Sequence, residues 1–252
     1  MKNFVGFGFT ISLVQILVVP LWAAVDATQL VKKVEEQSIG KSLEAKLKIT
    51  LNQSGGTREI EVLSWTEGKE KAMIKILKPL KDQNTANLRI KFDLWQYLPK
   101  IERTIKIPPS LMLQSWMGSD FTNDDLVKTS SMSRDYTHKF TAEETIDGTK
   151  TQHLTLSPKK DAPVVWGRIE VWINAANNTI VQQEFYSEKG ELLKRLKASQ
   201  VKTFGTHTIS SIVEMTTIKK GTSTKLEYVD AKFDQNIKAS VFSQSFLKDP
   251  LP

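Results

Sequence analysis

A repeated alternation of apolar and polar residues constrains the fold of this chain most strongly. Leu43, Ala45, Leu47, Ile49 and Leu51 occupy every second position, and charged or polar residues stand between them. A period of two places successive side chains on opposite faces of a β-strand. The segment therefore predicts a long strand with one buried face and one face in water.

The same pattern recurs along the chain, in segments that are separated by turn residues such as Gly, Asn and Asp. Further strands are expected at residues 58–65, 72–77, 88–94, 136–146, 151–157, 168–174, 179–187, 192–203, 208–219 and 225–233. Roughly ten strands with few helices predict one mainly β (α+β) domain, built on a large antiparallel sheet that is curved or partly closed. A sheet of this size encloses either packed side chains or a ligand.

Two helices are expected, one near each end of this domain. Asp26 and Gln29 are spaced as a capping box, apolar residues as far as Val34 share one helical face, and Gly40 marks the end. A short second helix is expected at residues 239–242. Both helices are in a position to cover an open end of the curved sheet.

The first 24 residues are typical of an export signal. Lys2 supplies a positive charge, residues 4–21 form an apolar run, and small residues follow at Ala24 and Ala27. Cleavage after Ala24, or as late as Ala27, leaves a single mature domain over residues 25–252. The alternative is a retained membrane anchor, because the apolar run is close to the ~18–20 residues that a spanning helix needs.

Composition excludes several classes of function. The chain has no cysteine, which excludes disulfides, thiolate metal sites, a cysteine nucleophile and lipidation of an N-terminal cysteine. Its net charge of +7 is dispersed, without the basic stripe interleaved with aromatic residues that nucleic-acid binding requires. The short lysine runs are interpreted as solvated turns, or as transient contacts with an anionic membrane surface.

The sequence contains no recognisable catalytic set. Three histidines, at 138, 153 and 207, each stand alone in a predicted strand, which favours structural roles. None of the common hydrolase, metalloprotease or nucleotide-binding motifs is present. We therefore expect neither enzymatic activity nor a metal or cofactor.

The sequence contains one acidic cluster, formed by Asp120, Asp124 and Asp125. A calcium loop is disfavoured because the glycine and the distal glutamate of such a loop are missing. We expect Thr122 to cap a helix, with Asp125 completing the capping arrangement. A hydrolase that uses Asp120 and Asp124 as a carboxylate pair remains a minor alternative.

The segment 94–105 combines aromatic residues, a proline turn and a strand. Ile101, Arg103 and Ile105 are predicted to share one face of that strand. An arginine among apolar neighbours needs a partner, because an unpaired buried charge is very costly. We expect Arg103 to pair with an aspartate of the acidic cluster or, alternatively, to meet an anionic or carbonyl group of a ligand.

Three motifs in this region match a known family pattern. They are residues 95–99 (WQYLP), the pair Ile101 and Arg103, and residues 115–126 (SWMGSDFTNDDL). In order and spacing they resemble the outer-membrane lipoprotein-sorting protein family, which is related to the LolA-like periplasmic carriers. The resemblance implies a curved, incomplete antiparallel β-barrel with covering helices and an apolar cavity.

The same resemblance implies a function. The protein would be a periplasmic carrier that holds a lipid or lipoprotein acyl chain and works with an inner-membrane transporter of the RND (resistance-nodulation-division) or ABC type. The alternative is an adaptor subunit of such a transporter, with no cargo of its own. Independently of the resemblance, we expect a monomer. Binding in an apolar cavity needs few polar contacts, because each buried methylene contributes ~0.8 kcal/mol.

Candidate cavity and lid residues are apolar or aromatic side chains near the irregular segment 108–126, together with Arg103. They are Ile90, Phe92, Leu94, Trp95, Tyr97, Arg103, Ile105, Met112, Trp116, Met117 and Phe121. Four residues of earlier strands, Leu47, Ile49, Ile74 and Ile76, are further candidates for the cavity lining. Ordinary core packing is the alternative for each of them.

Overall fold

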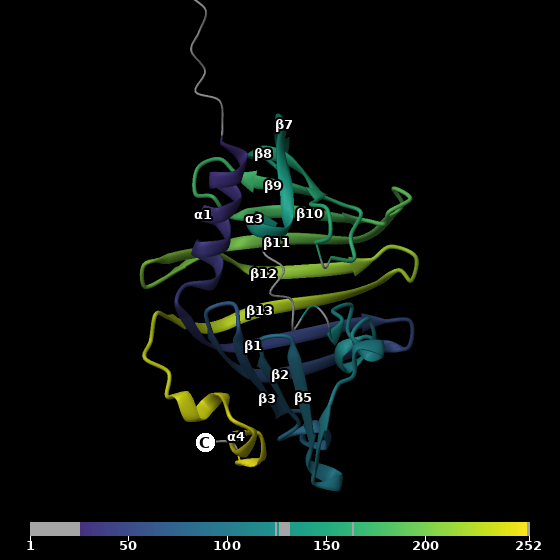
Figure 1. Cartoon of the computed structure of the whole chain (residues 1–252), viewed down its shortest axis with the longest axis vertical. Helices are drawn as coiled ribbons and strands as arrows, with labels where there is room; N and C mark the ends of the chain where they lie inside the picture. The colour runs from purple at the N-terminus through teal and green to yellow at the C-terminus, as the bar shows by residue number, and fades with distance from the viewer. Residues whose placement is uncertain (1–25, 124, 126–131, 163, 251–252) are drawn as a thin grey trace, which may run out of the picture.

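A computed structural model describes residues 26–123, 125, 132–162 and 164–250. In these residues thirteen strands form one sheet, in the order β6-β5-β4-β3-β2-β1-β13-β12-β11-β10-β9-β8-β7, and every neighbouring pair is antiparallel (Figure 1). The strands are β1 (Ser42–Gln53), β2 (Gly56–Glu67), β3 (Lys71–Lys78), β4 (Ala86–Ile90), β5 (Asp93–Leu98), β6 (Arg103–Lys106), β7 (Tyr136–Ile146), β8 (Thr149–Pro158), β9 (Arg168–Asn174), β10 (Ile180–Tyr186), β11 (Leu192–Phe204), β12 (His207–Thr217) and β13 (Thr222–Phe233).

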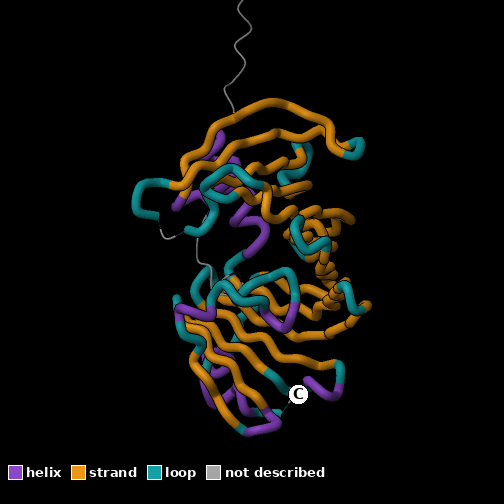
Figure 2. The backbone as a smooth tube through the Cα atoms, turned by 90° about the vertical axis from the view of Figure 1, so that its right-hand side faces the viewer, coloured by secondary structure: helices purple, strands orange, loops and turns teal. Residues whose placement is uncertain are grey.

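The sheet is strongly curved but open, because β6 and β7 form its two edges and do not pair with each other. Figure 2 shows the strands following one bent band rather than a closed ring. Register shifts interrupt several pairs, for example between Lys46 and Leu47, and such bulges bend a strand and increase its twist. The predicted mainly β, curved antiparallel architecture is confirmed, and the expected incomplete barrel is an open sheet rather than a partly closed one.

The estimate of roughly ten strands is too low, chiefly because residues 88–94 are not one strand. Lys91 has a φ of 54° and turns the chain between β4 and β5. A lysine in this left-handed conformation gives no signal in the sequence, unlike glycine or asparagine.

Helix α1 (Ala27–Ile39) forms as predicted. The Asp26 carboxylate accepts hydrogen bonds from the backbone N–H groups of Thr28 and Gln29, at 3.0 and 3.1 Å. Gly40 ends the helix with a φ of 62°, a conformation that favours glycine. The buried face of the helix, which includes Val31 and Val34, packs on apolar residues of β7, β8 and β9.

The register defines an inner and an outer face of the sheet. We call the face on which α1 lies the inner face. Residues paired across neighbouring strands point to the same face, so the inner face can be followed along one row of paired residues. This row runs from Val171 of β9 through Leu196 of β11 and Thr224 of β13 to Leu51 of β1. The apolar residues of the first predicted strand all point to this face and form its second core, with partners such as Ile76.

The C-terminal segment covers the other face, contrary to the expectation that both terminal helices close the same opening. The 3₁₀ helix η5 (Ala239–Phe242) and helix α4 (Gln244–Lys248) pack on outer-face side chains of β2, β3 and β4. The Phe246 ring meets Trp65 edge-on, with ring centroids 5.8 Å apart. Lys75 is fully buried below it and donates to the Asp249 carbonyl oxygen at 2.8 Å.

The remaining elements are short. They are α3 (Met132–Asp135) and the 3₁₀ helices η1 (Leu80–Asp82), η2 (Pro99–Ile101), η3 (Pro109–Leu111) and η4 (Trp116–Gly118). Within the described residues, no helix combines the length and apolar character needed to cross a bilayer. The predicted export signal lies outside the described residues.

Candidate functional site

A loop that we call the strap, residues 115–123 and 125, lies against the inner face. Trp116 is buried in the inner-face core, and its indole N–H donates to the Asn87 side-chain oxygen at 3.1 Å. Met117, beside it, adopts a φ of 51°, and Ser119 closes the turn by donating to the Trp116 carbonyl oxygen at 2.7 Å. The strap is therefore attached to β4 at this end.

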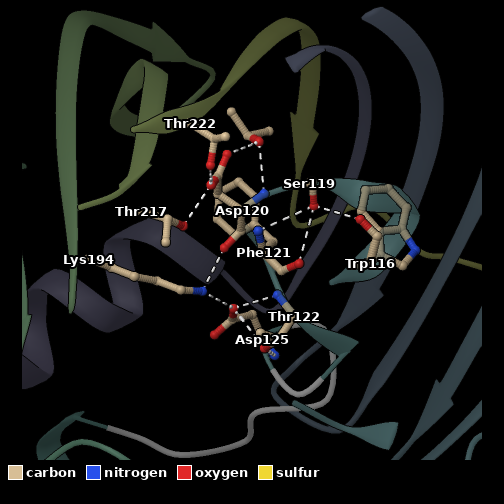
Figure 3. A network of polar contacts seen from close by, with 10 residues as sticks. Trp116, Ser119, Asp120, Phe121, Thr122, Asp125, Lys194, Thr217 and Thr222 are labelled. Carbon is tan, nitrogen blue, oxygen red and sulfur yellow. Dashed lines mark hydrogen bonds and ion pairs between the residues drawn. The ribbon is translucent and has the colours of Figure 1, made fainter. Parts of the chain in front are cut away.

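Asp120 attaches the strap to the opposite half of the sheet (Figure 3). Its buried carboxylate accepts hydrogen bonds from three threonine hydroxyls, Thr217 at 2.6 Å, Thr222 at 2.5 Å and Thr224 at 2.7 Å. These residues belong to β12 and β13, far from β4 in the sheet order. A buried carboxylate that is hydrogen-bonded in this way serves as an anchor, and its oxygens are occupied by protein donors.

Lys194 of β11 adds a further attachment. Its ammonium group donates to the Asp120 carbonyl oxygen at 2.6 Å and lies 3.5 Å from the Asp125 carboxylate. Asp125 also accepts from the backbone N–H of Thr122, at 2.7 Å, and from its hydroxyl, at 2.9 Å, while the Asp125 N–H donates back to that hydroxyl. The predicted capping arrangement of Thr122 and Asp125 is confirmed, whereas Asp124 lies outside the described residues.

The cavity candidates from the sequence divide between the two faces of the sheet. Leu94 and Ile105 lie in inner-face rows, and Trp116 and Met117 belong to the inner-face core or pack on it. Ile90, Trp95 and Tyr97 lie on the outer face and pack under the C-terminal segment. Phe121 of the strap and Met112, which precedes the strap, are both half-buried. The side chain of Phe92 is 73% exposed at the β4–β5 turn.

Arg103 is placed differently from the prediction. It is exposed at the start of β6, the edge strand, so it needs no buried partner. Ile101 belongs to η2 rather than to the strand, so the three residues at 101, 103 and 105 do not share a strand face. The aspartates that were predicted to pair with Arg103 have other partners. Asp120 binds threonines, and Asp125 binds Lys194 and Thr122.

The inner face contains a small apolar pocket that sequence reasoning missed. Its volume is about 180 Å³, and it lies between the end of α1 and strands β10–β13. Leu196, Ala198, Ile209, Val213 and Tyr228 contribute most of its wall, with Ser38, Thr179, Ile180, Gln183 and Ser210 at its margins. The alternation of residues 196, 198 and 226, 228 is visible in the sequence, but only the register shows that these positions converge.

Tyr228 is the aromatic residue of this pocket. Its side chain retains some accessible surface although protein surrounds it, and this removal from bulk water raises the pKa of the phenol. A buried tyrosine offers a large apolar ring together with one polar group. This combination suits a pocket for a mainly apolar ligand that carries a polar group.

Two other hollows differ in character. One of about 300 Å³ lies at the ends of β3 and β5, against η1, η2 and Met117 of the strap. The other, of about 380 Å³, lies over the outer face of β10–β12, where Asp147, Lys197 and Glu214 contribute charged side chains. Its charged lining suits an acyl chain less well than the apolar pocket of the inner face does.

Polar contacts hold α1 over the inner face at both ends. Near its start, the Thr28 hydroxyl and His138 Nδ1 are 3.0 Å apart. In its middle, buried Glu35 accepts from Lys69 Nζ at 3.0 Å and from the Ser133 hydroxyl at 2.6 Å. Lys69 follows β2, so this contact joins α1 to the other half of the sheet.

A histidine holds the last turn of α1. His207 lies with Nδ1 2.9 Å from the Gln37 carbonyl oxygen and Nε2 2.8 Å from the Asp234 carboxylate, and its ring stacks on Phe233. Asp234 also accepts from the Lys41 backbone N–H at 2.8 Å. Burial lowers the pKa of His207, but the bonds to Asp234 and Gln37 outweigh this and raise that pKa above its ordinary value. The charged imidazolium therefore fits this site best, because both nitrogens face acceptors.

Comparisons with known proteins agree with this architecture. A model for a family described as "Uncharacterized protein"-like matches residues 68–249. The chain belongs to this family. No curated protein matches it.

Several solved structures are similar to this chain, and they confirm at the level of the fold its resemblance to lipoprotein-sorting proteins. A DUF1329 family protein from Desulfovibrio piger superposes with a TM-score of 0.81 at 19% identity, covering 88% of this chain and 97% of that chain. A putative outer membrane lipoprotein-sorting protein domain from Vibrio parahaemolyticus gives 0.78 at 21%, covering 88% and 98%. A LolA superfamily protein from Nitrosomonas europaea gives 0.73 at 21%, covering 88% and 100%.

Proposed function

We propose that this protein is a carrier that binds a lipid or lipoprotein acyl chain on the inner face of its sheet and transfers it between membrane components. The observation that carries the proposal is the apolar pocket beneath the end of α1, in a fold shared with a LolA superfamily protein and a putative lipoprotein-sorting domain. An apolar chain gains free energy in such a pocket without specific polar contacts, at ~0.8 kcal/mol for each buried methylene.

The size of the pocket has a consequence for the mechanism. Its volume of about 180 Å³ is smaller than the roughly 300–1,000 Å³ typical of ligand sites. Binding of a long chain therefore requires α1 or the strap to shift. Polar contacts such as His207 with Gln37 and Asp234 fix the end of α1 in the position that the structure shows.

The sequence also supports a proposal about the cellular setting. We infer that residues 1–24 direct export and are removed, so that residues 25–252 act in the periplasm as one monomeric domain. The protein would act as a carrier rather than an enzyme, would need no cofactor, and would exchange its cargo with an inner-membrane transporter of the RND or ABC type.

The proposal is tested by analysis of bound lipid. The mature protein is purified without detergent and extracted with organic solvent, and the extract is examined by mass spectrometry, while binding of a fluorescent fatty acid is titrated in parallel. We expect stoichiometric lipid or saturable probe binding. Consistently empty protein that binds no probe would refute the proposal.

A matched pair of variants locates the site. Ala198 borders both hollows, but its register with Val213 directs its side chain to the inner face, so Ala198→Trp fills the inner pocket. Ser199→Trp, one residue along β11, points to the outer hollow instead. We expect the first to weaken probe binding at least ten-fold and the second to change it less than two-fold. Equal losses in both variants, or a loss only in the second, would contradict the assignment to the inner face.

The alternative is an adaptor subunit of an envelope transporter without cargo of its own. The small volume of the inner pocket favours this second candidate. In that case crosslinking in cells recovers a stable transporter complex, and Ala198→Trp leaves function in cells intact.

A further inference from the structure

We propose that the end of the sheet formed by η1 and η2 docks on a membrane surface with anionic headgroups, and that Leu80 and Ile101 enter that surface. This inference rests on the proposed carrier function and identifies the part of the molecule that meets the bilayer. We call this end, residues 80–82 and 99–101, the docking end.

The topology brings two separate turns together at this end. Strands β3 and β5 both pair antiparallel with β4, so they run in the same direction. Their last residues therefore lie at the same end of the strands. The turn η1 follows β3 and η2 follows β5, and residues of both turns line the same hollow of about 300 Å³. The two turns are therefore neighbours although about twenty residues separate them.

Each turn exposes a large apolar side chain. Leu80 is 82% exposed and Ile101 is 57% exposed. A single exposed apolar residue is ordinary, but here Ile101 lines the hollow and Leu80 directly precedes two residues that line it, so two exposed apolar side chains lie on turns that border the same hollow.

Each apolar residue has a lysine next to it. Lys81 follows Leu80 and Lys100 precedes Ile101, and both lysines are exposed and line the hollow. Asp82 of the same end lies 3.7 Å from Arg58, which offsets its charge. Glu102 follows Ile101, but Arg103 comes next, so basic residues still outnumber acidic ones around the two turns. Apolar side chains next to such cations match an anionic bilayer, in which the apolar side chains enter the acyl region and the lysines meet the headgroups.

The hollow connects this end with the inner face. Leu98, Pro99 and Ile101 line one side, and Met117 of the strap lines it as well. Met117 also packs against the inner-face core. An acyl chain that leaves the bilayer at the docking end would therefore meet apolar side chains that continue toward the inner face.

Vesicle flotation tests this proposal. The mature protein is mixed with vesicles of phosphatidylcholine containing 30% phosphatidylglycerol, or of phosphatidylcholine alone, at low and high salt. We expect binding to the anionic vesicles that falls with added salt, and weak binding to the neutral ones. Failure to bind the anionic vesicles would overturn the proposal.

The chain provides a matched control for the variants. Lys91 and Phe92 form an exposed lysine and aromatic pair at the β4–β5 turn, which lies at the opposite end of the same strands. The variants Leu80→Ser with Ile101→Ser, and Lys81→Gln with Lys100→Gln, should each reduce vesicle binding at least five-fold. Lys91→Gln with Phe92→Ser should change it less than two-fold, and a loss equal to that of the docking variants would refute the assignment.

The outcome separates this inference from the carrier function. The docking variants should bind a soluble fluorescent fatty acid as the unmodified protein does. Probe binding without vesicle binding overturns the docking proposal alone. Vesicle binding without probe binding or extracted lipid overturns the carrier function and supports docking by an adaptor.

Discussion

Thr224 of β13 makes two hydrogen bonds with Asp120 of the strap, accepting from its backbone N–H at 2.9 Å and donating to its carboxylate at 2.7 Å. The two residues are 104 positions apart in the chain. One hydroxyl thus fixes both the backbone and the side chain of Asp120, which holds the strap at a defined height over the inner face.

The first prediction concerns this anchor. Asp120→Asn removes the charge that three threonine hydroxyls bind and places an amide donor against at least one of them. We expect the free energy of unfolding to fall by about 2–4 kcal/mol, measured by urea denaturation. Asp147→Asn, at an exposed pair with Lys197, is the control and should stay within about 0.5 kcal/mol. Similar effects in both variants would contradict an anchoring role.

The second prediction concerns the end of α1. Gly40 has a φ of 62°, and a Cβ atom added there would lie 2.9 Å from Asp234 Oδ1 and 3.1 Å from Phe233 Cδ1. Gly40→Ala should therefore destabilise the protein by more than about 1 kcal/mol in thermal and urea unfolding. Gly55→Ala, where a Cβ would meet nothing, is the matched control and should leave stability nearly unchanged.

The third prediction concerns pH. The folded-state pKa of His207 is raised, so its stabilising contribution is complete below the unfolded value of about 6.5 and is lost as pH rises through the higher folded value. The hydrogen bond from His207 lowers the pKa of Asp234, so that group contributes above the unfolded value of about 3.9 and is lost in acid. The contact between His207 and Asp234, which we call the clamp, is therefore complete between these limits.

Urea unfolding at pH 6, 7 and 8 measures this dependence. The free energy of unfolding should decline over this range, and the decline should be smaller in His207→Gln. His138→Gln leaves the contact between His207 and Asp234 in place, so this variant should show the same decline in the free energy of unfolding as the unmodified protein. An unchanged slope in His207→Gln would show that the clamp does not link stability to pH.

The fourth prediction concerns the C-terminal cover of the outer face. The Phe246 ring packs edge-on to Trp65, and its centroid lies 4.1 Å from Lys75 Nζ. Burial lowers the pKa of Lys75, so this cation depends on the ring and on the Asp249 carbonyl oxygen for compensation. Phe246→Ala should cost about 2–4 kcal/mol and make the C-terminal segment sensitive to proteolysis. Phe92→Ala, an exposed aromatic, should do neither.

The sequence predicts the strands of the second half closely, since clear turn residues bracket a strict alternation. The expected bounds 136–146 and 168–174 are those of β7 and β9. The helical cap at Asp26 and the local pair Thr122 and Asp125 were also predictable, because their partners lie within a few residues.

The candidate site was less predictable, since it depends on contacts between distant residues. Alternation shows that Trp95 and Tyr97 share a face but not which face, because both faces of this part of the sheet are buried. Their cover comes from η5 and α4, more than 140 residues later in the chain. The three threonines that bind Asp120 likewise follow it by 97 to 104 residues.

The position of the strap has a mechanical consequence. Among the described residues, one end of the strap is bonded to β4 and the other to β11, β12 and β13, so the strap spans the β1–β13 pair in the middle of the sheet. The strap therefore acts as a cross-brace on the inner face. A change in the curvature of the sheet between β4 and β11 would have to lengthen or break these side-chain contacts, even if every ladder bond between the strands stayed intact.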